Sequence, residues 1–268
     1  MKEINLTDCE AVALGAGILG TGGGGNTYLG QIWLEAEFVT HANPCRIIDA
    51  SQTNDDDLYC AVGTMGAPTV GVEKIPRGDE LEKAVRALEE HIGRSFDGIL
   101  IGEIGGANAL KPLICALQMN LPVVDGDGMG RAFPELQMDS FAIGGLDLAP
   151  LALGDCHGNQ VILSTVNSPK QAESYARNLT IEMGGSVALA MPMMTGKDLK
   201  SLLIRGTLSL AKSIGQGVIR ARNVGEDPIE PIIALTNGRL LFSGKITDVE
   251  RRTNRGFSLG KMQLAAFD

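Results

Sequence analysis

Between residues 97 and 138, short apolar runs alternate with glycine-rich and acidic segments. Residues 99–101 form a branched apolar run of the length of a buried strand, and Gly102 follows it. Residues 107–119 then carry apolar side chains at helical spacing, and residues 121–124 are a second short apolar run. A strand, a helix and a strand in this order predict a βαβ unit, in which the two strands run parallel.

Similar patterns predict elements on the N-terminal side of this unit. Strands are expected over residues 45–49 and 58–63, and helices with one apolar face over 7–19, 27–37 and 78–92. Asn26 is placed to cap the second of these helices. That helix is expected to bury three apolar side chains, Leu29, Ile32 and Trp33.

The C-terminal part of the chain begins at Ser168 and Pro169, a pair typical of a helix start. We therefore place a domain boundary just before it, which divides the chain into residues 1–166 and 167–268. The second region is expected to contain a short strand at 187–190, one long helix over 193–215 and strands from residue 232 onward.

These patterns together predict an α/β protein. The N-terminal domain is expected to be a three-layer structure around a mostly parallel sheet, because its strands alternate with helices. The C-terminal region is expected to be a smaller α+β part rich in β-structure, because the last residues alternate like an antiparallel ribbon.

The composition narrows the class of protein. The 268 residues are 44% hydrophobic and 21% charged, which is typical of a globular chain with a sizeable core. A formal net charge of −9 argues against nucleic acid or an anionic membrane as a partner. Five cysteines without a CxxC pair, no signal-peptide pattern and no apolar run of membrane-spanning length predict a cytoplasmic protein with reduced thiols. A small molecule is the expected partner, and the long apolar helix faces are compatible with a homo-oligomer.

Polar residues follow both strands of the predicted βαβ unit. Glu103 and Asn108 come after the first strand, and Asp125 and Asp127 come after the second. Because ligands bind at the carboxyl ends of parallel strands, these four residues are the candidate catalytic group. Asp125 and Asp127 are also candidate metal ligands, since acidic clusters bind Mg²⁺ or Mn²⁺, or Zn²⁺ if His or Cys joins them. The alternative is that these Asp-Gly segments only form turns.

Further candidates could bind an anionic part of a substrate. A glycine run immediately before a helix leaves backbone N–H groups that suit a carboxylate or phosphate, although it could equally be a hinge. Arg131 could grip a substrate carboxylate or neutralise nearby acids such as Glu135. The candidate binding residues are Gly22, Gly23, Gly24, Gly25 and Asn26 in the glycine run, Met65 and Gly66 after another strand, and Arg131 and Glu135.

Cys156 and His157 lie between two apolar runs, in a polar segment that contains a glycine. This arrangement is typical of a β-hairpin turn. Adjacent residues of a turn point in different directions, so a hairpin is favoured over a metal or nucleophile site.

Several segments resemble the S-methyl thiohydantoin desulfurase family, which was long catalogued only as a domain found beside hydantoinase and oxoprolinase genes. They are GEIGGAN at 102–108, LPVVDGDGMGRAFPELQM at 121–138, LGTGGGGN at 19–26, MGAP at 65–68 and SGKITDVERR at 243–252. The resemblance implies a hydrolase that converts an S-methyl thiohydantoin with a propionate arm into a hydantoin and methanethiol. Members of the family usually continue beyond the position of Asp268, so the C-terminal region is expected to be incomplete relative to the family.

For that reaction, Asp125 or Asp127 is the expected base or metal ligand, Glu103 its partner and Asn108 the orienting residue. Two other functions remain open at this point. One is an ATP- and Mg²⁺-dependent enzyme related to hydantoinases and oxoprolinases, or an accessory subunit of one. The other is a small-molecule binding protein without catalytic activity.

Overall fold

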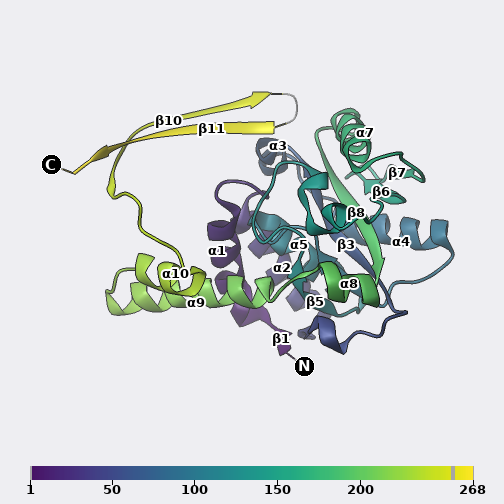
Figure 1. Cartoon of the computed structure of the whole chain (residues 1–268), viewed down its shortest axis with the longest axis horizontal. Helices are drawn as coiled ribbons and strands as arrows, with labels where there is room; N and C mark the ends of the chain where they lie inside the picture. Colours follow the sequence, from purple (N-terminus) through teal and green to yellow (C-terminus); the bar gives the residue numbers. More distant parts are fainter. Residues whose placement is uncertain (1, 255–256, 268) are drawn as a thin grey trace.

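The computed structural model describes residues 2–254 and 257–267. Within these ranges, nine strands form one sheet in the order β1-β2-β5-β4-β3-β8-β6-β7, and β9 pairs with β5 (Figure 1). The four central strands run parallel: β2 (Cys45–Ile48), β5 (Val123–Asp127), β4 (Gly98–Ile101) and β3 (Leu58–Gly66). The predicted α/β class and the parallel βαβ unit are therefore confirmed.

Antiparallel strands extend this parallel centre on both sides. They are β1 (Lys2–Ile4), β6 (Leu151–Gly154), β7 (Gln160–Leu163), β8 (Ser186–Thr195) and β9 (Ile204–Arg205). The β6–β7 pair is the hairpin expected around Cys156 and His157. Because β8 lies between β3 and β6, residues on both sides of position 166 contribute to one sheet.

Helices cover both faces of the sheet. The α-helices are α1 (Cys9–Gly20), α2 (Thr27–His41), α3 (Pro68–Glu73), α4 (Glu80–Ile92), α5 (Lys111–Met119), α6 (Ser140–Ile143), α7 (Pro169–Glu182), α8 (Gly196–Leu202), α9 (Thr207–Val224) and α10 (Ile229–Thr236). Short 3₁₀ turns are η1 (Leu6–Asp8), η2 (Ala50–Gln52), η3 (Gly106–Ala109) and η4 (Leu136–Met138). No helix in the described ranges has the length and apolar character needed to cross a bilayer.

Alternate residues of the central strands enter different cores, as the pleat of a strand requires. Cys60 and Val62 of β3 pack with residues of α1, α2, α4 and α5 on one face. Tyr59 and Ala61 pack on the other face with Phe141 and with residues of α8. This alternation produces the expected three-layer arrangement.

Helices α1 and α9 cross at two glycines. A Cβ atom on Gly15 would lie 1.8 Å from the carbonyl oxygen of Ala211, and one on Gly215 would lie 1.9 Å from that of Ala11. Neither position has room for a larger residue, because the obstacle is backbone in both cases. The two helices therefore approach each other more closely than side chains at these positions would allow.

The expected long helix over residues 193–215 is wrong. This segment contains the end of β8, then α8, β9 and the start of α9. Gly206 adopts a φ of +77° at the start of α9, and its N–H donates to the carbonyl oxygen of Asp125. The pairing of β9 with β5 therefore interrupts the helical pattern, and a glycine at position 206 accommodates the positive φ at this point.

Two further expectations are corrected in part. The strand expected from residue 232 is wrong, because residues 229–236 form α10. The helix expected over residues 107–119 is divided into η3 and α5. The antiparallel ribbon at the end of the chain is confirmed as β10 (Gly244–Asn254) paired with β11 (Phe257–Ala266), which lies apart from the nine-stranded sheet in Figure 1.

Candidate functional site

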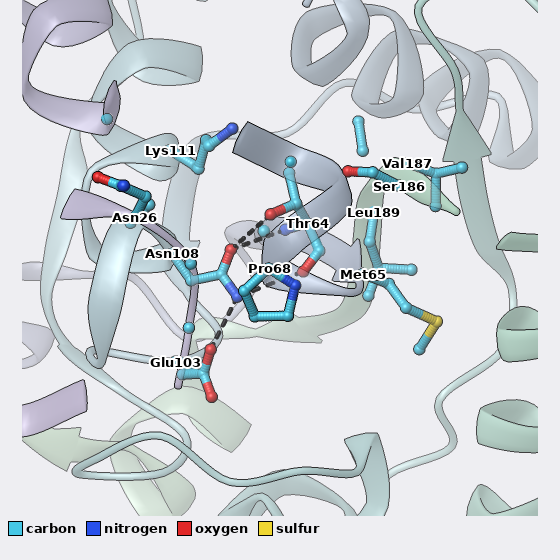
Figure 2. Close-up of a pocket in the computed structure, with 18 of the residues that line it drawn as sticks. Asn26, Thr64, Met65, Pro68, Glu103, Asn108, Lys111, Ser186, Val187 and Leu189 are labelled. Carbon is cyan, nitrogen blue, oxygen red and sulfur yellow. Dashed lines mark hydrogen bonds between the residues drawn. The ribbon is translucent and has the colours of Figure 1, made fainter. Parts of the chain in front are cut away.

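A cavity of about 690 Å³ lies beyond the carboxyl ends of β3 and β4. Its wall includes the glycine loop at 20–25, the end of β3, and residues of α2, α3, η3 and α5. In Figure 2, Lys111, Asn108 and Glu103 lie on one side of the view, and Met65, Val187 and Leu189 lie on the other. The volume and the mixture of apolar surface with a few polar groups are typical of a small-molecule site.

Three polar residues form a hydrogen-bonded chain in this cavity (Figure 2). The Asn108 side-chain nitrogen donates to Oε2 of Glu103 over 2.7 Å. The Asn108 oxygen accepts from the backbone N–H and the hydroxyl of Thr64, at 3.0 and 2.9 Å. The other Glu103 oxygen, Oε1, accepts from the backbone N–H of Phe133 over 3.0 Å. Both carboxylate oxygens of Glu103 are thus held in place.

The position of Glu103 changes its acidity. Burial raises the pKa of Glu103 to about 7, although the hydrogen bonds from Asn108 and Phe133 act in the opposite direction. Asp127 adds to the rise because a second negative charge disfavours ionisation. With a pKa near neutrality, this carboxyl group can both accept and donate a proton at the same pH.

Lys111 is a residue of the cavity that the sequence analysis did not identify. It is the first residue of α5 and follows Asn108 by three positions, a spacing that brings side chains to one side of a helix. Its ammonium lies 4.5 Å from the centroid of the Trp33 ring. Burial lowers the pKa of Lys111 to about 8, while the charge of Glu80 acts in the opposite direction.

Helix α2 contributes apolar side chains to the cavity lining, and one of them is Trp33. Leu29 and Ile32 were expected to be buried, but they are 40% and 45% exposed and line the cavity. The expectation was wrong because an apolar helix face can cover a ligand cavity as well as a core. The helical pattern is the same in the two cases.

The glycine loop lines the cavity and holds η3 in place. The N–H groups of Asn108 and Ala107 donate to the carbonyl oxygens of Gly24 and Gly25, over 3.0 and 3.3 Å. Gly24 has a φ of +74°, and a Cβ atom there would lie 1.9 Å from the carbonyl oxygen of Gly105. Position 24 therefore requires a glycine, because two backbone segments are in contact there.

Asn26 caps α2 as expected. Its side-chain oxygen accepts the N–H groups of Tyr28 and Leu29, at 3.0 and 3.3 Å. These two donors are therefore already satisfied at the helix start. An anion-binding role for Gly22, Gly23, Gly24, Gly25 and Asn26 remains a prediction, although all five line the cavity.

Asp125 and Asp127 lie elsewhere than expected. Both belong to β5 rather than to a turn after it, because Asp127 pairs with Ile101 of β4, and β9 pairs with Gly126 and Asp127. The Asp125 carboxylate accepts the backbone N–H of Ser209 over 3.0 Å and lies 3.7 Å from the ammonium of Lys2. Neither aspartate is among the residues that line the cavity.

Asp127 holds backbone next to the cavity in place without lining the cavity itself. Its carboxylate accepts the backbone N–H groups of Ile104, Met129 and Gly130, at 2.9 to 3.0 Å. Burial raises the pKa of Asp127 to about 6, against the effect of these hydrogen bonds. Since Ile104 directly follows Glu103, Asp127 fixes the loop that presents Glu103 to the cavity.

The metal-binding role expected for Asp125 and Asp127 remains a prediction. In the part of the chain that the structure describes, no group of three His, Cys, Asp or Glu side chains is placed to hold an ion. The oxygens of Asp127 already accept backbone donors, which a cation would have to displace. We therefore derive no chemical step through a metal.

The remaining candidates are divided between the cavity and its edge. Met65 and Gly66 belong to the end of β3, pair with β8 and line the cavity. Glu135 lines it too, whereas Arg131 is exposed, donates to the Thr21 hydroxyl over 2.7 Å and lies outside the lining. Cys156 lines the cavity, and its neighbour His157 is exposed in the β6–β7 turn.

Comparison with known proteins is consistent with this architecture. An X-ray crystal structure of a protein from Chromobacterium violaceum matches with a TM-score of 0.75 and 25% sequence identity, covering 92% of this chain and 68% of that chain. None of the curated proteins matches this chain. Residues 7–165 match the model of the S-Me-THD-like N-terminal domain, and residues 167–268 match that of the S-Me-THD-like C-terminal domain. Because these two matches span nearly the whole sequence, the chain belongs to the S-Me-THD-like family, the S-methyl thiohydantoin desulfurase-like proteins.

Proposed function

We propose that this protein hydrolyses an S-methyl thiohydantoin to a hydantoin and methanethiol, with Glu103 as the group that transfers protons. The observation that carries the proposal is the Glu103 carboxyl group, which lies in the cavity with a pKa of about 7 and both oxygens oriented. Membership of the S-Me-THD-like family supports a thiohydantoin-related reaction. Glu103 thereby takes the role of base that the sequence analysis gave to Asp125 or Asp127.

The reaction begins with attack by water. The Glu103 carboxylate accepts a proton from the water molecule, and the water oxygen bonds to the ring carbon that carries the methylthio group. That carbon is bonded to two nitrogens and is amidine-like, so its C=N electron pair moves to the ring nitrogen. The protonated Glu103 then gives its proton to this nitrogen, which leaves a neutral tetrahedral intermediate.

The intermediate then loses methanethiol. Glu103 accepts the proton of the new hydroxyl group, the C=O bond forms and the C–S bond breaks. The departing sulfur receives that proton from Glu103, so the products are a hydantoin and methanethiol, and the carboxylate is regenerated. A proton-transfer group with a pKa near the working pH is the most effective one for such repeated transfers.

The surrounding residues support these steps without taking part in bond changes. Thr64 fixes the Asn108 amide, and Asn108 in turn holds one oxygen of Glu103. The apolar side chains of Met65, Val187 and Leu189 line the cavity and offer nonpolar surface for a methylthio group. This apolar surface also limits the water that competes for the Glu103 hydrogen bonds.

The direct test is methanethiol release from an S-methyl thiohydantoin propionate, measured in the headspace so that protein thiols do not interfere. The wild-type protein should release methanethiol, and Glu103→Gln should lower kcat/KM by about 10²- to 10⁴-fold. Glu90→Gln, at an exposed position of α4, is the matched control and should retain activity. Release that Glu103→Gln leaves unchanged would exclude Glu103 as the proton-transfer group.

Two additions to this assay separate the other functions. Chelator treatment should leave the rate unchanged, whereas a loss restored by Mg²⁺, Mn²⁺ or Zn²⁺ would show a metal requirement. ATP should not raise the melting temperature, whereas a nucleotide that bound the folded state would raise it. Stabilisation by the thiohydantoin without any product would identify a binding protein instead of an enzyme.

A further inference from the structure

Lys111 differs from the other two basic residues that line the cavity in what surrounds its charged group. The Lys74 ammonium donates to the carbonyl oxygens of Met183, Gly184 and Ser186, at 3.0 to 3.4 Å. Arg177 is paired with Glu173 over 2.7 Å. In the described part of the chain, no carboxylate lies within ion-pairing distance of the Lys111 ammonium, which faces the Trp33 ring.

The charge of Glu80 raises the pKa of Lys111, but the Glu80 carboxylate has other hydrogen-bond partners. One oxygen of Glu80 accepts the backbone N–H of Arg77, and the other accepts that of Gly78 over 2.8 Å. Glu80 therefore holds the segment that leads into its own helix. Among the described residues, no acceptor takes a hydrogen bond from the Lys111 ammonium, which lies where burial makes the charge costly.

Trp33 is held in the position that the ammonium requires. Its indole N–H donates to Oε1 of Glu37 over 3.1 Å, and the same oxygen accepts from the Gln118 side chain over 2.7 Å. The ring therefore has a fixed orientation, and its face is turned toward Lys111 at 4.5 Å. A cation above an aromatic face keeps its N–H donors on the opposite side available for an anion.

We propose that Lys111, held over Trp33, binds the carboxylate of an acidic arm on the substrate and makes the cavity selective for ring compounds that carry such an arm. The ring chemistry rests on the proposed function, whereas the anion site rests only on Lys111 and its surroundings. Lys111 and Asn108 are three residues apart, and Asn108 contacts Glu103. A ring beside Glu103 can therefore extend a short arm along this side of the cavity toward Lys111 (Figure 2).

This assignment places the anion site away from the two positions expected from the sequence. Arg131 is exposed at the edge of the cavity and donates to Thr21. In the glycine run, Asn26 itself satisfies two backbone donors at the start of α2. Lys111 lies in the cavity wall, and among the described residues its ammonium has no hydrogen-bond acceptor.

The test uses the emission of Trp33, which is the only tryptophan of the sequence and therefore reports on this part of the cavity. Hydantoin propionate, the product of the proposed reaction, and its neutral propionamide are titrated into the protein. The wild-type protein should bind the acid roughly 10- to 100-fold more tightly than the amide, because a charged hydrogen bond is lost with the amide. In Lys111→Met and Lys111→Gln this preference should fall to about twofold or less.

A matched control is Lys170→Met, which removes one positive charge at an exposed position of α7 and should keep the wild-type preference. The two neutral variants of Lys111 differ in polarity, so one folded variant is sufficient for the comparison. For turnover, loss of Lys111 should raise KM for the acidic substrate and leave kcat nearly unchanged.

Equal binding of acid and amide by the wild-type protein would overturn the proposal, as would a preference that both Lys111 variants retain. A fall in kcat without a change in KM would overturn it too, because Lys111 would then act in the chemical step. If the wild-type protein prefers the acid but releases no methanethiol, the proposed reaction fails and the anion site stands. The two conclusions can therefore fail separately.

Discussion

The Nδ2 atom of Asn108 lies 2.7 Å from Oε2 of Glu103 and donates a hydrogen bond to it. The orientation of the amide is determined by its other end, where two donors of Thr64 require an acceptor. An amide has one oxygen and one NH₂ group, so the NH₂ group must face the carboxylate. This contact stabilises the charged form of Glu103 and opposes the effect of burial on its pKa.

Asn108→Ala is expected to move the pH dependence of the reaction. Without the amide donor, the pKa of Glu103 rises above about 7, because a hydrogen bond that lowered it is lost. The acidic limb of kcat/KM should therefore shift upward by up to about one pH unit, which a pH–rate profile measures. Thr64→Val removes only the hydroxyl donor to Asn108 and should cause a smaller shift in the same direction. An unchanged acidic limb in Asn108→Ala would show that another group sets it.

Two glycines of one loop provide a matched pair of variants. Gly24→Ala places a Cβ atom 1.9 Å from a backbone oxygen, at a φ of +74°. Gly22→Ala has a φ of +95°, but in the described part of the chain no atom lies within 4 Å of its Cβ. Denaturant unfolding should show a loss of about 1–2 kcal/mol for Gly22→Ala from backbone strain alone. Gly24→Ala should lose about 3 kcal/mol or more, since overlap with backbone is added. Similar losses would show that crowding at Gly24 is relieved by a small shift of the loop.

The stability of the protein is expected to depend on the protonation of Asp139. This residue is 3% exposed, and its side chain accepts the N–H of Ala142. Burial raises the pKa of Asp139 to about 6, against the effect of its backbone hydrogen bonds. The folded state then holds a proton that the unfolded state has already lost, so the free energy of unfolding falls as the pH rises through this interval. The contribution is up to about 3 kcal/mol between about pH 4 and pH 6.

Asp139→Asn should remove this part of the pH dependence, which urea unfolding at several pH values can measure. Asp127 has a pKa raised in the same direction, so some slope should remain in the variant. Asp56→Asn, at an exposed position, is the control and should keep the wild-type slope. A slope that Asp139→Asn leaves unchanged would mean that Asp139 ionises at its ordinary pKa in the folded protein.

Asp125 is expected to contribute to stability, whereas its sequence context suggested a role as base or metal ligand. Its carboxylate accepts the Ser209 N–H in the first turn of α9, and Asp125→Ala leaves that donor without its partner. The free energy of unfolding should fall by about 1–2 kcal/mol, the usual effect of losing such a capping contact. Methanethiol release should stay within about twofold of the wild-type rate, because Asp125 lies outside the cavity lining. A loss of activity as large as that of Glu103→Gln would restore Asp125 to the catalytic group.

Sequence patterns predicted the features that depend on neighbouring residues. The strand at β4, the parallel partner β5, the cap at Asn26 and the β6–β7 hairpin all follow from local spacing and turn residues. Glu103 and Asn108 were identified for the same reason, since a strand followed by a glycine turn places polar residues at the ligand-binding edge of a sheet. These parts of the site could be named without any knowledge of tertiary contacts.

The sequence by itself thus determined the α/β class, the βαβ unit and the two residues that meet at its edge. Tertiary structure decided the rest, because Asp127 pairs with Ile101 of β4 and with β9, which lies about 80 residues farther along the chain, so that Asp125 and Asp127 lie within β5. It also decided that Leu29 and Ile32 line a cavity, since helical spacing identifies an apolar face but not what covers it. Lys111 became a site residue because packing places it in the cavity wall, against Trp33 of a different helix. Local periodicity predicted the elements of the βαβ unit but not those of residues 193–236, and pairing and packing between distant segments decide which side chains share a cavity.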